Sequence, residues 1–191
     1  MSAAPQPAEG AAPTRSCGSC SLCCKVMAIT ALDKPAGAWC GHCRPGREGC
    51  TIYPTRPEEC RTFTCLYLLD ARLGEEWRPS NSKIVLVTEM DGDRIVAHVD
   101  PQRPDAWRLD PYYRDLKKWA RMSLPFRGQV MVCVGRRAFM IYPDRDVDLG
   151  ICGLDEVIIV NERQTPTGVE FEPLKVSRDD PRARRFAPRA D

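Results

Sequence analysis

Hydrophobic and polar residues alternate over much of the chain after residue 82, and this period of two is typical of β-strands with one buried face. The alternating segments come in pairs that are separated by turn residues such as Gly, Asp and Pro, as in β-hairpins. We therefore predict three hairpins. Their strands are Lys83–Glu89 with Arg94–Val99, Gln129–Val134 with Ala138–Tyr142, and Glu156–Val160 with Gly168–Val176.

Two other segments carry apolar residues three and four positions apart, which is the spacing of one helical face. We predict helices over 57–72 and from Pro111 to about Met122. The apolar positions are Phe63, Leu66, Leu69 and Leu73 in the first helix and Tyr113, Leu116, Trp119 and Ala120 in the second. Strands and helices do not alternate regularly, which argues against a doubly wound parallel sheet.

The cysteines have a third pattern, since nine of the eleven lie between residues 17 and 65. The first four read C-x-x-C-x-x-C-C, and the others follow at wider intervals. This dense group consists of Cys17, Cys20, Cys23, Cys24, Cys40, Cys43, Cys50, Cys60 and Cys65.

These patterns predict an α+β protein in which a cysteine-rich, partly helical metal-binding lobe precedes a lobe of β-hairpins with one helix. The predicted organisation has four parts. They are a disordered lead-in over 1–16, a cysteine-cluster region over 17–75, an α+β region packed on it over 76–176, and a flexible tail over 177–191.

Charge and composition narrow the classes of function. The chain has 28 basic and 26 acidic residues, and this balance argues against a nucleic-acid or membrane-surface partner. No apolar run approaches the roughly 18 residues of a membrane span. The first 16 residues lack the apolar stretch of a secretory signal, so we expect a cytoplasmic protein whose thiols stay reduced.

Reduced thiols at this density are typical of metal sites. Zinc takes four thiolate or imidazole ligands in a tetrahedron, and iron–sulfur clusters also take cysteine thiolates, usually four. Nine thiols can therefore supply two four-ligand sites or one cluster with several spare. The run departs from that of ferredoxins, because the fourth cysteine follows at once and no proline comes after it.

Several residues near the cluster leave alternatives open. Neighbouring side chains diverge, so Cys23 and Cys24 are not expected to bind one isolated ion, and one of them can bind a second metal or remain a reactive thiol. His42 is either a nitrogen ligand or, as we favour, a residue outside the ligand set. Cys133 and Cys152 lie outside the dense group, and we predict that they pack as small apolar side chains.

The opening motif resembles that of the C-x-x-C-x-x-C-C family, also called YkgJ-family cysteine cluster proteins. The resemblance rests on the first four cysteines, on Cys50-Thr51-Ile52-Tyr53, and on Arg56-Pro57-x-x-Cys60-Arg61-x-Phe63-x-Cys65. It covers roughly residues 17 to 70 and implies a domain that chelates zinc or iron. It implies no particular activity.

We therefore expect a metal-binding protein that chelates zinc or iron through its cysteine cluster, with metal ions as its partners. An iron–sulfur or thiol-dependent oxidoreductase is the alternative. The sequence contains no Gly-rich phosphate loop, nucleophile elbow or H-E-x-x-H motif, so it leaves open whether the protein is an enzyme, and it identifies no protein partner.

Overall fold

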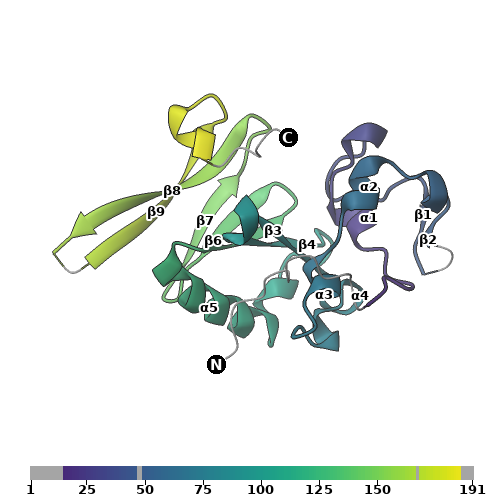
Figure 1. Ribbon diagram of the computed structural model, residues 1–191, viewed down its shortest axis with the longest axis horizontal. Helices are drawn as coiled ribbons and strands as arrows, with labels where there is room; N and C mark the ends of the chain where they lie inside the picture. The colour runs from purple at the N-terminus through teal and green to yellow at the C-terminus, as the bar shows by residue number, and fades with distance from the viewer. Residues whose placement is uncertain (1–14, 47–48, 167, 186–191) are drawn as a thin grey trace.

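A computed structural model describes residues 15–46, 49–166 and 168–185, and it has the α+β fold that the sequence predicts. A five-stranded sheet lies at the centre of the molecule, a long two-stranded ribbon projects from one side, and the cysteine-bearing segments form the other side (Figure 1). The predicted disordered lead-in lies outside the described residues, except for its last two positions.

The central sheet has the order β3-β4-β5-β6-β7 and contains the first two predicted hairpins. β4 and β5 are parallel, and helix α5 (Tyr112–Ser123) lies in the connection between them, close to its predicted bounds. The other neighbouring strands are antiparallel. The strands are β3 (Ile84–Glu89), β4 (Arg94–Val99), β5 (Gln129–Val134), β6 (Arg137–Ile141) and β7 (Asp146–Ile151).

Alternate residues of the sheet enter two separate cores, as the pleat requires. One face packs against α5, where Leu116 is fully buried beside Val130 and Val132. The opposite face, which includes Val96 and Met140, packs against the ribbon. Both faces are therefore covered, which explains why the central strands are so apolar.

The ribbon is the third predicted hairpin, and its strands β8 (Glu156–Thr165) and β9 (Gly168–Ser177) are longer than predicted. The chain then forms the 3₁₀ helix η7 (Pro181–Arg185), in which Ala183 is buried against Ile159 and Val176. Ordered structure therefore continues through the first half of the predicted flexible tail. Residues 186–191 of that tail lie outside the described residues.

The cysteine region consists of very short elements. It is attached to the sheet through Leu22, Val26 and Leu66, which belong to the same core as Val85. Its elements are α1 (Cys23–Val26), η1 (Thr30–Leu32), β1 (Cys43–Arg44), β2 (Gly49–Cys50), η2 (Tyr53–Thr55), α2 (Glu58–Thr62) and α3 (Leu66–Leu69). The remaining short helices are η3 (Glu75–Trp77), α4 (Pro79–Ser82), η4 (Met90–Gly92), η5 (Ala106–Arg108) and η6 (Leu124–Phe126).

The predicted single helix over 57–72 is wrong, because the chain forms α2 and α3 with a break between them. Phe63 and Cys65 have extended backbone angles, with ψ of 122° and 152°. A continuous helix would place Cys60 and Cys65 about 140° apart around its axis. The break removes this constraint, and both residues line the same cavity.

A buried ion pair links the cysteine region to the sheet. Lys25 lies on α1 between the cysteines and Val26, and its ammonium reaches Asp100 at the end of β4 at 2.6 Å. It also donates to Gln102 at 2.7 Å. The side chains of Lys25 and Asp100 are only 3% and 9% exposed, so each charge depends on the other for its stabilisation.

The substitution Asp100→Asn should lower the free energy of unfolding by about 3 kcal/mol, because it leaves the buried ammonium of Lys25 without a counter-charge. Asparagine keeps an acceptor for the backbone N–H of Gln102, which Asp100 now binds at 2.9 Å. The loss of stability would therefore reflect the missing negative charge rather than the loss of the hydrogen bond with Gln102. Urea unfolding monitored by circular dichroism measures it.

The matched control is Asp105→Asn. Asp105 is 82% exposed and pairs with Arg108 at 3.9 Å, so this change should cost less than about 0.5 kcal/mol. Equal losses in the two variants would show that the Lys25–Asp100 pair has no special role.

Candidate functional site

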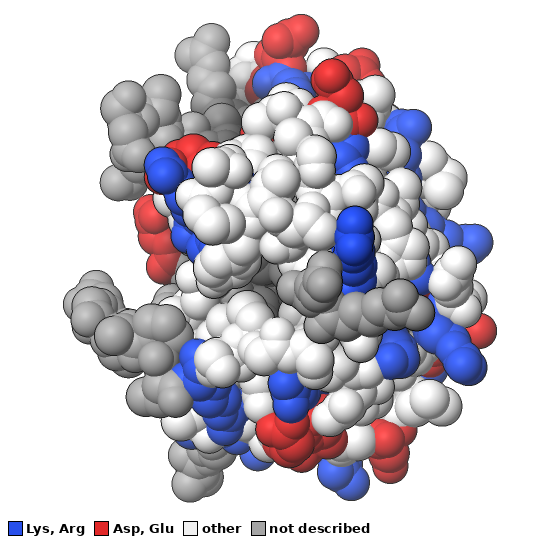
Figure 2. Space-filling model, turned by 90° about the vertical axis from the view of Figure 1, so that its right-hand side faces the viewer, with Lys and Arg blue, Asp and Glu red and all other residues white. Residues whose placement is uncertain are grey.

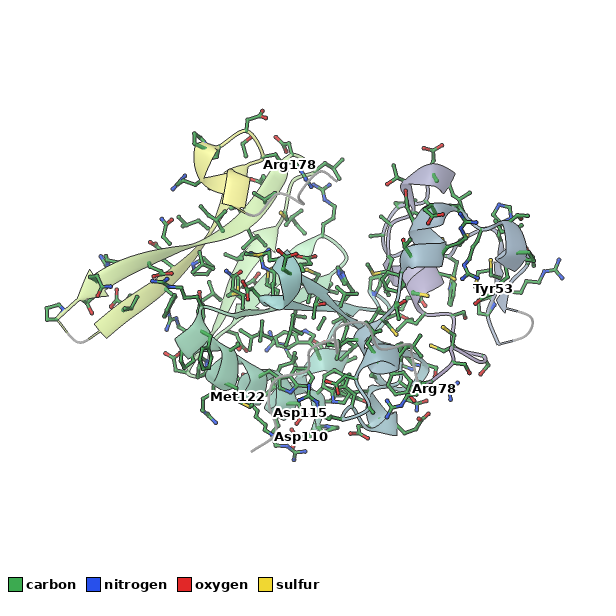
Figure 3. The ribbon with its side chains drawn as sticks, in the orientation of Figure 1. Tyr53, Arg78, Asp110, Asp115, Met122 and Arg178 are labelled. Atoms are coloured by element: carbon green, nitrogen blue, oxygen red, sulfur yellow. The ribbon has the colours of Figure 1, made fainter. Side chains whose placement is uncertain are left out.

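All nine cysteines of the dense group line one cavity of about 680 Å³. They come from five places in the chain, namely residues 17–24, residues 40–43, Cys50, Cys60 and Cys65, which the short elements bring together. Cys133 and Cys152 do not line this cavity. The structure thus separates Cys133 and Cys152 from the dense group, and Tyr53 and Arg78, which Figure 3 labels, also line the cavity.

The first two cysteines form a loop knuckle rather than part of a helix. The backbone N–H of Cys20 donates to the carbonyl of Cys17 at 2.9 Å, which closes a tight turn. Gly18 occupies this turn with a φ of +53°, and a Cβ there would lie 3.1 Å from the guanidinium of Arg78. Helix α1 begins only at Cys23, so of the two arrangements open to C-x-x-C the chain has the knuckle.

Backbone hydrogen bonds fix the middle cysteines relative to α1. The N–H of Cys40 donates to the carbonyl of Cys24 at 2.9 Å, and the N–H of Cys43 donates to Cys40 at 3.0 Å. Cys43 and Cys50 are directly opposite each other in the β1–β2 pair. Residues in such a pair have Cβ atoms about 4.5–5.5 Å apart, a spacing from which two thiolates can reach one ion.

The thiols fall into two groups, according to which neighbouring thiols raise the pKa of each. The first group consists of Cys17, Cys20 and Cys65, and the second consists of Cys40, Cys43, Cys50 and Cys60. In the first group, burial raises the pKa of Cys65 to about 11, and the neighbouring thiols Cys17 and Cys20 contribute to the increase. Burial likewise raises the pKa of Cys17, and the thiols of Cys20 and then Cys24 contribute to the increase.

In the second group, burial and Cys24 raise the pKa of Cys43 to about 11. Burial also raises the pKa of Cys60, and the thiols that add to this increase are those of Cys24, Cys40 and Cys50. Cys24 therefore lies between the two groups. Its own pKa is raised first by a hydrogen bond with the thiol of Cys23, and it also shares a hydrogen bond with Cys43.

Two arginines lie near the exposed thiol of Cys17, and both partly offset the increase in its pKa. The central carbon of the Arg56 guanidinium lies 3.7 Å from the centre of the Tyr53 ring, and Arg56 donates to the carbonyl of Cys60 at 3.2 Å. Arg78 donates to the carbonyl of Cys17 at 3.3 Å from α4's side of the cavity. Figure 2 faces the cysteine region, and basic side chains are spread there over a largely uncharged surface.

Lys34 is the buried cation of the second group. Its ammonium donates to the carbonyl of Lys25 at 2.8 Å and to that of Met27. Burial lowers the pKa of Lys34, and this effect exceeds the opposing influence of the thiolates of Cys40, Cys24, Cys23 and Cys60. Lys34 is not among the site residues that the sequence predicts, because a single lysine beside an apolar run gives no signal that its side chain points inward.

Metal-ligand geometry is not preformed in the part of the chain that the structure describes. No three of its His, Cys, Asp or Glu side chains converge there as ligands of one ion. His42 is exposed and does not line the cavity. The structure therefore gathers the thiols without closing them around a point.

Of the two outlying cysteines, Cys133 lies on the central sheet and Cys152 directly follows its last strand, β7. Cys133 is on β5 opposite His98 of β4, and both Cys133 and Cys152 pack against the core beneath the ribbon. Burial raises the pKa of Cys133 to about 12 and lowers that of His98 to about 4, so both are uncharged at neutral pH. This agrees with packing roles for both cysteines.

Comparisons with known proteins assign neither a family nor a function to this chain. No protein-family model, curated protein or solved structure matches this chain. Among the residues that the structure describes, no helix is both long and apolar enough to cross a bilayer.

Alkylation of Cys133 in the native protein should be slow at pH 8 and should accelerate about tenfold per pH unit, because only the thiolate reacts and the pKa is about 12. Iodoacetamide labelling between pH 8 and 10, quantified by mass spectrometry of the peptide that contains Cys133, measures this.

The control is the same labelling in denaturant, where the rate should level off above the ordinary cysteine pKa of about 8.5. A rate that levels off below pH 10 in the native protein would contradict the burial of Cys133.

Proposed function

We propose that this protein binds zinc or iron through its cysteine cluster and that metal binding is its main biochemical property. The observation that carries this proposal is that nine thiols from five segments line one cavity, while the two remaining cysteines lie elsewhere. Thiols that served only to fill a core would be spread among the apolar residues of both lobes.

The donor set suits a borderline or soft metal. Thiolates bind zinc and iron–sulfur clusters far better than they bind magnesium or calcium, which prefer oxygen. The two electrostatic groups described above can provide two metal centres with Cys24 between them. A reducing compartment such as the cytoplasm would keep these thiols available.

Convergence on an ion requires only local movement. Each cysteine thiol turns about a single χ1 bond, and the backbone hydrogen bonds already place the Cα atoms around the cavity. Ligation would also offset the repulsion between neighbouring thiolates that raises the pKa of Cys24, Cys43 and Cys60.

A second candidate function is supported by the contacts of Cys24. Its thiol shares hydrogen bonds with both Cys23 and Cys43, and vicinal thiols in contact are suited to redox chemistry. This favours an iron–sulfur or thiol-dependent oxidoreductase. In protein purified without oxygen, visible charge-transfer absorption favours an iron–sulfur or iron–thiolate centre, whereas a colourless protein with bound zinc favours the first function.

Freshly purified protein should contain at least one tightly bound zinc or iron per chain, and serine at Cys17, Cys20, Cys60 or Cys65 should lower this content sharply. Each of these thiols lines the cavity and belongs to one of the two groups. Elemental analysis of protein prepared without oxygen or chelators is the measurement.

Serine at Cys133 or Cys152 serves as the control and should leave the metal content unchanged, because neither residue lines the cavity. Equal loss in both sets would mean that the cavity is not the metal site, and wild-type protein free of metal would overturn the proposed function.

Removal of the metal should disorder residues before Cys65 and leave the sheet after Lys83 folded. The cysteine region is made of elements of two to five residues, whose ordering costs roughly 1–2 kcal/mol per residue. Ligation contributes on the order of 10 kcal/mol in small metal-folded peptides. Amide hydrogen exchange measured along the chain, with and without metal, gives the answer. Unchanged protection in verified apo protein would show that the metal does not hold this region together.

A further inference from the structure

Two buried lysines lie beside the cysteine cavity, and their surroundings differ in one respect. Lys25 has a carboxylate partner, Asp100, and an amide partner, Gln102. Lys34 is also buried, at 7% exposure, but no carboxylate among the described residues lies within ion-pair distance of its ammonium. Within the described part of the chain, its ammonium donates hydrogen bonds only to two backbone carbonyls, those of Lys25 and Met27.

A buried ammonium without a counter-charge is costly. Carbonyl groups satisfy its hydrogen bonds, but they supply only partial charges, and lysine is almost never fully buried unless it is paired. Other carboxylates of this region are engaged elsewhere or exposed: Glu59 accepts from the N–H groups of Thr30 and Ala31, at 2.8 and 3.2 Å, and Asp33 is exposed.

The backbone holds Lys34 in this position. Lys34 and Ile29 exchange two backbone hydrogen bonds, of 2.9 and 3.1 Å, across the tight loop that contains η1. Asp33 precedes Lys34 with a φ of +48°, a conformation that closes this loop. The ammonium is thus directed back under α1, towards the carbonyls of Lys25 and Met27.

The groups that can become negative near this ammonium are thiols. Cys23 and Cys24 lie on α1 beside Lys25, whose carbonyl accepts from this ammonium, and the N–H of Cys40 donates to the carbonyl of Cys24 at 2.9 Å. In agreement with this placement, the thiols of Cys40, Cys24, Cys23 and Cys60 oppose the effect of burial on the pKa of Lys34. A metal ion bound by four thiolates carries a net negative charge, since the thiolates outweigh the two positive charges of zinc. Such a centre would supply the counter-charge that Lys34 lacks.

We propose that Lys34 is the built-in counter-ion of an anionic metal–thiolate centre that includes Cys24, Cys40 and Cys60. This inference rests on the proposed function, and it adds which thiols form the centre, the sign of its charge and a residue outside the ligand set on which its affinity depends. Lys34 does not bind the metal. It stabilises the ligated form of the site and destabilises the empty one.

These opposite effects of Lys34 on the stability of the ligated and the empty site give the test. Lys34→Met removes the charge, so zinc should bind at least about tenfold more weakly than to the wild type, as measured by competition with a chromophoric chelator. The metal-free variant should be as stable as metal-free wild type where the empty cysteine region is disordered, and more stable where that region keeps the ammonium buried without a counter-ion. Urea unfolding of the full chain with and without zinc measures both states.

Three further variants separate charge from structure. Lys34→Arg keeps the charge and should retain most of the zinc affinity, whereas Lys34→Gln keeps a donor for the carbonyls but should lose affinity as the methionine variant does. The Gln variant also serves if the Met variant does not fold. Lys118→Met changes an exposed lysine of α5 and should alter neither quantity.

The possible results distinguish this inference from the proposed function. Wild-type protein that takes up neither zinc nor iron overturns both. Wild-type zinc affinity in the Met and Gln variants overturns the role of Lys34 alone. Lower stability of these variants without metal, with no change in zinc affinity, would show that Lys34 only binds backbone carbonyls, and this also overturns the inference.

Discussion

The scarcity of apolar side chains in the cysteine region is the constraint on which the rest of the structure depends. A segment of two- to five-residue elements cannot bury enough surface to offset its ordering entropy. It is held instead by a few long-range contacts, in which Leu22 and Val26 enter the core of the sheet and Lys25 pairs with Asp100. The central sheet therefore acts as the support on which the cysteine-lined cavity is assembled.

The same constraint explains why charge is so prominent around the cavity. Thiols that are brought together in a partly buried place repel one another once they ionise. Burial and then this repulsion raise the pKa of Cys43 and Cys60, and at Cys24 a hydrogen bond with Cys23 is the largest cause of the increase, ahead of burial and repulsion. Lys34 lies among the thiols of the second group, and Arg56 and Arg78 lie near Cys17 of the first. Positive charge is thus available to both groups of thiols, although it comes from elements far apart in the sequence.

Features set by local pattern were predictable from the sequence. The three hairpins and helix α5 follow from periodicity and turn residues, and the separation of Cys133 and Cys152 from the other cysteines follows from spacing. Strand β7 was missed because Asp146, Asp148 and Gly150 are residue types that strands disfavour, and its pairing with β6 supplies what its sequence lacks. The break between α2 and α3 was missed because apolar spacing continues through it. The inward direction of Lys34 and the pairing of Lys25 depend on residues distant in the chain, and no local pattern encodes them.

The ion pair between Lys25 and Asp100 also has a consequence for biosynthesis. The two residues are 75 positions apart, and the ribosome makes the N-terminal partner first. At roughly 5–20 residues per second, several seconds separate the appearance of the two residues. During this interval α1 has neither its ionic partner nor the sheet against which it packs. Its cysteines are therefore exposed on the nascent chain, where they are open to oxidation and to any free metal before the cavity of the folded protein exists.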